Sequence, residues 1–177
     1  MRPQVIIVMG VSGAGKSTVG RALAAELSWA FYDADDFHPA SNVSKMAAGV
    51  ALNDADRQPW LDALHGLIST TLETSQTAVL ACSALKKSYR RVLRGELGKA
   101  VRVVYLAGSF ELIKERLEAR SGHFMKAELL RSQFAALEKP EDALTVSIDQ
   151  HVTAIVEMVI TELRLERRDL THEQRNV

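Results

Sequence analysis

The chain has 177 residues, of which 47% are apolar and 25% are charged, and these proportions suit a globular domain with a buried core. Its 22 basic residues balance its 22 acidic residues, so no overall positive field favours nucleic acid or an anionic membrane. The single cysteine, Cys82, excludes an intrachain disulfide and suits a reducing compartment. The apolar run at residues 5–9 is too short for a signal peptide or a membrane span, so we expect a cytoplasmic protein.

Short apolar runs alternate with longer amphipathic patterns, which predicts an α/β domain with a five-stranded, mostly parallel sheet and helices on both faces. Strands are expected at residues 4–9, 29–32, 77–82, 101–106 and 144–148. Helices are expected at residues 16–27, 39–48, from Asn53 or Asp54 onward, at about 85–94, from about Phe110, and at about 152–163. We predict one domain over residues 1–165, with a lid at about 116–137, and a polar tail at 166–177.

Residues 10–17 fit the phosphate-loop pattern G-x-x-x-x-G-K-[ST] between a strand and a helix. Glycines let backbone N–H groups turn toward phosphate oxygens, Lys16 brings a charge to the β- and γ-phosphates, and Ser17 offers its hydroxyl to Mg²⁺. A plain glycine turn is the alternative, and the strand and helix on either side argue against it. The predicted ATP-binding residues here are Gly10, Val11, Ser12, Gly13, Ala14, Gly15, Lys16, Ser17 and Thr18.

The motif alone does not separate a kinase from a GTPase or a motor. The chain has no Asn-Lys-x-Asp guanine-reading motif, and it is short, with its phosphate loop close to the amino end. Both features favour a small-molecule kinase.

Two acidic residues, Asp33 and Asp35, follow the second predicted strand. Side chains two residues apart in an extended segment share a face, and ligands of open α/β sheets bind at the carboxyl ends of strands. We predict Asp35 as the base that takes the proton of the attacking hydroxyl, and Asp33 as a residue on the Mg²⁺ side. The alternative is an acidic turn in which Asp36 caps the next helix. His38 is expected either to bind substrate or to cap a turn.

Several motifs in this order resemble the gluconokinase family of shikimate-kinase-like P-loop kinases. They are Asp33-x-Asp35-x-x-His38-Pro39, Asn42-x-x-Lys45-Met46, Leu52-Asn53-Asp54-x-Asp56-Arg57-x-Pro59-Trp60-Leu61, Cys82-Ser83-Ala84-Leu85-Lys86-Lys87-x-Tyr89-Arg90 and Gly122-His123-Phe124-Met125. The resemblance spans nearly the whole chain. It implies a three-layer P-loop NTPase sandwich with a helical lid, ATP:D-gluconate 6-phosphotransferase activity, and a homodimer.

A sugar acid needs cations for its carboxylate and polar groups along its row of hydroxyls. Arg57 is the first choice for the carboxylate because a guanidinium can hold it through two parallel hydrogen bonds, with Arg90 or Lys86 assisting. A solvated basic helix face is the alternative for Lys86 and Arg90. Ser83 ends the third strand and is predicted near the Mg²⁺ water. The predicted substrate-binding residues are Asp35, His38, Lys45, Arg57, Lys86, Arg90 and His123.

Arg116 and Arg120 lie four residues apart, on one face of a predicted helix that ends before Ser121-Gly122. This segment resembles a kinase lid that closes over ATP and excludes water. We predict Arg120 as the catalytic lid cation beside Lys16 and Asp35, and Arg116 as a contact to adenine or phosphate. An exposed ion-pair face with Glu115 and Glu118 is the alternative.

Two other functions remain open from the sequence. The acceptor could be shikimate, idonate or a nucleoside monophosphate, although Cys82-Ser83-Ala84 stands where shikimate kinases usually carry a glycine run. The chain could also be a nucleotide-binding regulator that has no acceptor.

Overall fold

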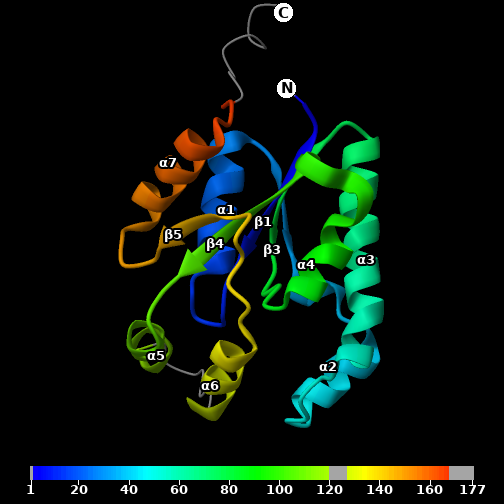
Figure 1. Ribbon diagram of the computed structural model, residues 1–177, viewed down its shortest axis with the longest axis vertical. Helices are drawn as coiled ribbons and strands as arrows, with labels where there is room; N and C mark the ends of the chain where they lie inside the picture. The colour runs from blue at the N-terminus through cyan, green and yellow to red at the C-terminus, as the bar shows by residue number, and fades with distance from the viewer. Residues whose placement is uncertain (1, 120–126, 168–177) are drawn as a thin grey trace, which may run out of the picture.

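The computed structural model describes residues 2–119 and 127–167, which form a three-layer α/β sandwich (Figure 1). All strand pairs of its central sheet are parallel, and the strand order is β2-β3-β1-β4-β5. The strands are β1 (Gln4–Met9), β2 (Ala30–Asp33), β3 (Thr77–Ala81), β4 (Val101–Ala107) and β5 (Leu144–Ser147). The predicted fold class is confirmed, and each strand lies within one residue of its predicted bounds.

Seven α-helices and two 3₁₀ segments connect the described strands. The α-helices are α1 (Lys16–Leu27), α2 (Ala40–Ala47), α3 (Asp54–Glu73), α4 (Lys87–Arg94), α5 (Phe110–Glu118), α6 (Ala127–Ala136) and α7 (Val152–Leu163). The 3₁₀ segments are η1 (Ala34–Phe37) and η2 (Gly95–Ala100). Asn53 caps α3 in a reciprocal capping box with Asp56, which decides between the two predicted caps.

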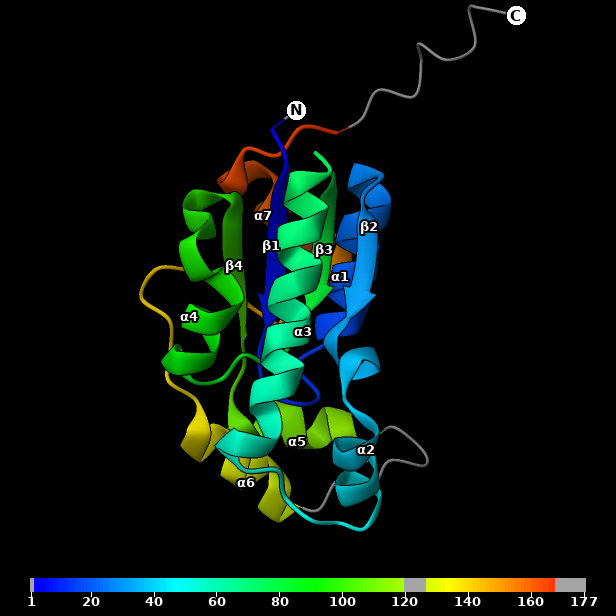
Figure 2. The same cartoon turned by 90° about the vertical axis from the view of Figure 1, so that its right-hand side faces the viewer.

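The two faces of the sheet build two separate hydrophobic cores. In β1, Ile6 and Val8 face α1 and α7, whereas Val5, Ile7 and Met9 face α3 and α4. Figures 1 and 2 show these helix pairs on opposite sides of the strands. Because β1 is buried on both faces, it is apolar along its length instead of alternating in polarity.

The carboxyl ends of the strands all point to one edge of the sheet. The phosphate loop, η1, α2, α5 and α6 lie beyond this edge (Figure 2). No helix within residues 2–119 and 127–167 is both long and apolar enough to cross a bilayer. At the other end of the molecule, Leu165 is buried and Arg167 donates hydrogen bonds to Glu26 and Glu157.

Candidate active site

The phosphate loop connects β1 to α1 and has the conformation that its glycines predict. Gly13 and Gly15 have φ angles of +84° and +92°, in the left-handed region that side chains disfavour. A Cβ atom at Gly13 would also come within 2.8 Å of Leu117 Cγ on α5. Gly15 precedes the first turn of α1, so the amino end of that helix, with its free N–H groups, opens onto the loop.

Lys16 lies at the centre of this end of the sheet. Its Nζ donates a hydrogen bond to the carbonyl oxygen of Val11 over 3.1 Å. Burial lowers the pKa of Lys16, and the nearby carboxylates of Asp35 and Asp33 oppose that shift. The structure therefore brings together the predicted phosphate-binding cation and both predicted carboxylates.

The acidic pair adopts a different backbone from the one predicted. The extended segment ends at Asp33, and residues 34–37 form η1, so Asp33 and Asp35 do not alternate along one strand. Asp33 itself caps η1, because its Oδ1 accepts a hydrogen bond from the Asp35 N–H over 3.2 Å. The alternative in which Asp36 caps the next helix is not observed, because Pro39 occupies the N-cap position of α2. Asp35 is exposed, whereas Asp33 is half-buried and accepts hydrogen bonds at both carboxylate oxygens.

Ser17 and Asp33 offer oxygen ligands to a divalent cation. Ser17 Oγ donates a hydrogen bond to Asp33 Oδ2 over 2.6 Å, so the two oxygens lie side by side below the phosphate loop. Within the described ranges, no three His, Cys, Asp or Glu side chains form an all-protein metal cluster. This arrangement fits Mg²⁺, which typically takes one or two protein oxygens and fills its remaining positions with water and substrate phosphates.

Ser83 follows β3 at the same edge of the sheet and is half-buried. Its predicted place near the Mg²⁺ water stays a prediction. Its neighbour Cys82 is buried, and this burial raises the pKa of the Cys82 thiol to about 12. Cys82 is therefore a packing residue, as its position on a central strand leads one to expect.

His38 lies between η1 and α2, with its ring stacked on Trp60 at a centroid distance of 4.5 Å and an interplanar angle of 11°. Trp60 is in the core, and its Nε1 donates to the Ala34 carbonyl over 2.7 Å. Asn42 is 2% exposed; its Nδ2 donates to the Asp56 carbonyl over 2.8 Å and lies 3.4 Å from His38 Nδ1. His38 is thus held rigidly beside Asp35, and burial together with Arg57 lowers its pKa.

Three of the predicted acceptor-side cations gather around the amino end of α3, where two carboxylates hold two of them. Lys86 donates to both carboxylate oxygens of Asp54 over 2.8 Å, and Lys45 pairs with Asp56 over 2.6 Å. These hydrogen bonds lower the pKa values of both carboxyls. The charged groups therefore stay ionised and ordered, although all are at least partly solvated.

Tyr89 joins this cluster from α4. Its hydroxyl donates to Asp54 Oδ1 over 2.5 Å, and the Lys86 ammonium and the Arg57 guanidinium lie 5.4 Å and 5.9 Å from its ring centroid. Arg57 also donates to the Leu52 carbonyl. Sequence reasoning gave no role in the site to Asn42, Asp54, Asp56 or Tyr89. All four stand in the motifs that carry the family resemblance, which was the available signal.

Arg90 has a different environment from the other predicted cations. It is 8% exposed, and its Nη1 donates to the carbonyl oxygens of Ala84 and Leu85, each over 3.0 Å. These bonds support the loop between β3 and α4, which carries Lys86. The expectation of a solvated face fails for Arg90, and its bonds in the structure suit support of the loop more than direct contact with an acceptor.

The structure describes the lid on both sides of residues 120–126. Arg116 donates to the Ile148 carbonyl, in the segment between β5 and α7. Arg120 and His123, predicted as the lid cation and a substrate contact, lie outside the described residues. Helix α6 fills much of the remaining predicted lid, and its Gln133 side chain accepts a hydrogen bond from the Ser12 N–H over 2.7 Å. Sequence reasoning did not find this contact.

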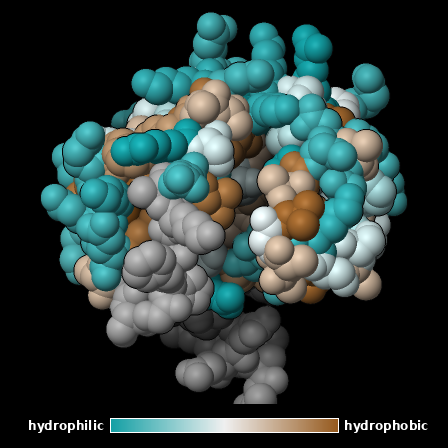
Figure 3. Space-filling model, turned by 90° about the horizontal axis from the view of Figure 1, so that it is seen from below, coloured by the Kyte–Doolittle hydropathy of each residue, from teal (hydrophilic) through white to brown (hydrophobic). Residues whose placement is uncertain are grey.

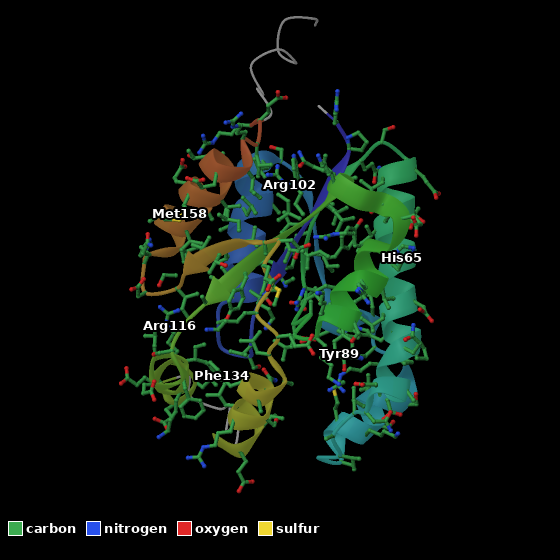
Figure 4. The ribbon with its side chains drawn as sticks, viewed as in Figure 1. His65, Tyr89, Arg102, Arg116, Phe134 and Met158 are labelled. Carbon is green, nitrogen blue, oxygen red and sulfur yellow. The ribbon has the colours of Figure 1, made fainter. Side chains whose placement is uncertain are left out.

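Most of the predicted site residues that the structure describes lie at the carboxyl edge of the sheet, where the surface forms a recess (Figure 3). Arg116 and Phe134 lie on one side of it and Tyr89 on the other (Figure 4). Figure 3, which looks onto this edge, shows the surface hollowed between the two sides. A separate cavity of about 950 Å³ opens at the opposite edge, among Arg2, Lys99 and Arg102, away from the residues described here.

Comparison with known proteins agrees with this geometry. The family model for shikimate kinase matches residues 12–163. A probable gluconokinase of Mus musculus is 48% identical over 181 residues, which cover 92% of this chain and 98% of the mouse protein. The thermoresistant gluconokinase of Escherichia coli K12 is 43% identical over 164 residues, covering 90% of this chain and 93% of its own.

Solved structures extend the agreement to three dimensions. A crystal structure of a gluconokinase from Sinorhizobium meliloti 1021 superposes with a TM-score of 0.84 and 39% sequence identity, covering 93% of this chain and 94% of that one. This chain is a member of the gluconokinase family, within the shikimate-kinase-like P-loop kinases.

Proposed function

We propose that this chain is an ATP-dependent gluconokinase that converts D-gluconate to 6-phospho-D-gluconate. The observation that carries the proposal is that Lys16, Asp33 and Asp35 lie close together beside the phosphate loop. The predicted acceptor-side cations Lys45, Arg57 and Lys86 gather at the amino end of α3. Curated relatives named gluconokinase, 40–48% identical along most of the chain, support the choice of acceptor.

The proposed reaction is a direct, in-line transfer without a covalent enzyme intermediate. The oxygen on carbon 6 of gluconate forms a bond to the γ-phosphorus, and the bond from that phosphorus to the β–γ bridging oxygen breaks. ADP leaves with the bridging electrons. Asp35 orients the attacking hydroxyl and takes its proton, a role that its exposed position beside Lys16 supports.

Positively charged groups of the protein would stabilise the negative charge on the phosphate oxygens during the transfer. Lys16 would contact the β- and γ-phosphates, and Ser17 and Asp33 would hold Mg²⁺, which screens the phosphate oxygens when bound. The lid arginines are proposed to complete this set, with Arg120 on the transferring group and Arg116 toward adenine or phosphate. By comparison with arginine fingers, loss of Arg120 should lower kcat on the order of 10³-fold.

The acceptor side suits a hydroxylated carboxylate. Arg57, Lys45 and Lys86 supply positive charge at the end of the recess near α3, and His38 and Tyr89 supply polar atoms beside them. We propose that Arg57 holds the gluconate carboxylate, because neither Asp54 nor Asp56 holds it as they hold the two lysines.

A panel of acceptors in a coupled assay for ADP release tests the proposal. The panel contains D-gluconate, idonate, shikimate and a nucleoside monophosphate, each with MgATP and purified protein. We expect saturable turnover with D-gluconate, and a product with one phosphate on carbon 6 by ³¹P and ¹³C NMR.

Two results would contradict it. Turnover with shikimate and none with gluconate would leave the phosphate-loop chemistry in place but refute the acceptor. Slow ATP hydrolysis that no acceptor accelerates would indicate a nucleotide-binding regulator instead of a kinase.

We also propose that the protein is a cytoplasmic homodimer. The resemblance to the gluconokinase family supports the dimer, and the single buried cysteine suits a reducing compartment. Sedimentation velocity at micromolar concentration tests the dimer: a species near 39 kDa is expected for two copies of the 19.5 kDa chain. A monomer at every concentration would refute it.

A further inference from the structure

Helix α6 contacts the phosphate loop through one side chain. The Ser12 N–H donates a hydrogen bond to Gln133 Oε1 over 2.7 Å, between residues 121 positions apart in the sequence. The Ser12 N–H belongs to the same peptide unit as the Val11 carbonyl, and that carbonyl accepts the hydrogen bond from Lys16 Nζ over 3.1 Å. One peptide plane therefore joins an amide on α6 to the ammonium group of the phosphate-binding lysine.

The packing of α6 makes this contact a fixed one. Leu130, one turn before Gln133, is 1% exposed and belongs to the core that includes Ile113 and Leu117. Phe134 meets Phe110 edge to face at a centroid distance of 5.5 Å. The backbone of α6 is thus anchored on α5, and the side chain of Gln133 projects toward the loop from a rigid base.

A peptide plane that is held at both ends has little freedom to rotate. On its carbonyl side the plane is also held by the Ala14 N–H, which donates to the Val11 oxygen over 3.2 Å. If Gln133 is removed, the Ser12 N–H loses its acceptor, and only the carbonyl side still holds the Val11–Ser12 plane. The Val11 carbonyl then holds Lys16 Nζ less firmly in one position. Hydrogen bonds that share a peptide unit also polarise one another, so loss of one weakens the other.

We propose that Gln133 is a positioning residue for phosphoryl transfer, which acts on Lys16 through the Val11–Ser12 peptide. This inference rests on the proposed kinase function, and it adds to it a link between the lid helix and the phosphate-binding lysine. The link also leaves the Ser12 N–H engaged.

The test is a double-mutant cycle between Gln133 and Lys16. Gln133→Met keeps the length of the side chain and its helix propensity but removes the acceptor. Dissociation constants for a non-hydrolysable ATP analogue are measured for the wild type, Gln133→Met, Lys16→Ala and the double variant. No acceptor substrate is needed, so the result does not depend on whether gluconate is the correct acceptor.

We expect Gln133→Met to weaken analogue binding about ten-fold, which corresponds to about 1.4 kcal/mol, the size of one hydrogen bond. In the Lys16→Ala background the same change should alter binding less than two-fold, because the group on which Gln133 acts is gone. In the kinase assay, kcat should fall at least ten-fold while KM for the acceptor stays within two-fold.

Two controls separate positioning from general damage to the fold. Ser132→Ala changes the neighbouring side chain, whose hydroxyl bonds within α6 to the Leu129 carbonyl over 2.8 Å, and should leave binding and kcat unchanged. Gln133→Ala provides a second variant if Gln133→Met unfolds at a lower temperature. Equal effects of the Gln133 change in both Lys16 backgrounds, or no effect in either, would overturn the proposal.

Discussion

At the scale of single residues, the two carboxylates after β2 differ in how many bonds they already make. Asp33 accepts hydrogen bonds from Ser17 Oγ and from the Asp35 N–H, so both of its oxygens are engaged. Asp35 is exposed at the rim of the recess. This difference in bonding supports the proposal that Asp33 caps η1 and helps to hold Mg²⁺, and that Asp35 takes the proton of the attacking hydroxyl.

The first prediction follows from that assignment. Asp35→Asn keeps the shape of the side chain but removes its basicity, so kcat should fall by about 10²–10⁴-fold. The affinity for MgATP, measured by calorimetry, should stay within about three-fold, since Asp33, Ser17 and the phosphate loop are unchanged. Asp36→Asn, at the exposed neighbouring position, is the matched control and should retain activity. Full turnover by the Asp35 variant would exclude it as the base.

A second prediction concerns acid. Hydrogen bonds from Lys45 and from the Asn53 N–H lower the pKa of the Asp56 carboxyl below its usual 3.8. The unfolded chain therefore binds this proton more readily than the folded protein does. The stabilisation is complete above the usual pKa of Asp and is lost as the pH falls through the lowered folded value.

Thermal unfolding between pH 6 and pH 2.5 tests this directly. The Tm difference between the wild type and Asp56→Asn should be largest near pH 6 and should shrink below about pH 4. Lys45→Met removes the principal cause of the shift and should abolish most of this pH-dependent difference. A Tm difference that stays constant with pH would contradict the assignment.

At the scale of elements, two glycines in helices have opposite surroundings. Gly20 on α1 faces β2 so closely that an added Cβ would lie 2.7 Å from Phe31 Cε2, and the Arg21 guanidinium covers that ring at 4.5 Å. Gly66 lies on the exposed side of α3, with nothing within 4 Å of an added Cβ. Close packing explains the first glycine, and no packing contact requires the second.

The third prediction uses these two positions as a matched pair. Gly20→Ala should lower the free energy of unfolding by about 1–3 kcal/mol, because Phe31 must move. Gly66→Ala should raise it by about 0.5–1 kcal/mol, because alanine loses less backbone entropy in a helix. Urea denaturation of both variants measures these values. Equal effects of either sign would show that packing on β2 does not limit α1.

Local signals predicted most elements, because strand and helix periodicity, the glycines of the phosphate loop and the Asn53 cap all act over a few residues. The prediction missed η1 because it extended the strand conformation through Asp35, whereas the Asp33 side chain accepts the Asp35 N–H and the chain turns there. Local signals also left Arg90 open between contact with the acceptor and a solvated basic face. Tertiary packing turns Arg90 inward onto the Ala84 carbonyl and leaves Arg91 exposed.

The contacts of α6 and of the segment that follows it could not be predicted locally either, because their partners are far away in the sequence. Gln133 meets Ser12 across 121 positions, and Glu138 accepts from the Lys87 N–H over 2.5 Å across 51 positions. Glu138 also donates its own N–H to the Leu85 carbonyl over 2.9 Å. No periodicity in residues 127–138 identifies such partners, because the tertiary fold brings together residues that are distant in the sequence.

At the scale of the whole molecule, the two cores share one sheet, so neither can open without exposing the other. Cys82 follows β3 near the centre of that sheet and is 1% exposed. Its thiol becomes accessible only when the sheet itself comes apart. With its pKa raised to about 12, the native thiol is also almost entirely protonated near neutral pH.

The fourth prediction follows. At pH 8 the native protein should react with iodoacetamide at least about 10³-fold more slowly than the urea-unfolded chain, as measured by intact-mass spectrometry. MgATP should slow the reaction further, because a ligand that binds only the folded state makes unfolding rarer. Rapid modification of the native protein would reveal local opening around β3 instead.

This inert thiol makes the recess accessible to distance measurement. Val43 on α2 and Leu129 on α6 are 50% and 48% exposed, and Figure 1 shows their helices on opposite sides of the end of the molecule that carries the recess. Cysteines introduced at these two positions could carry a fluorescent donor and acceptor while Cys82 remains in place and unlabelled. Because Cys82 does not need to be replaced, single-molecule energy transfer between the two labels could follow the distance across the recess with and without bound nucleotide.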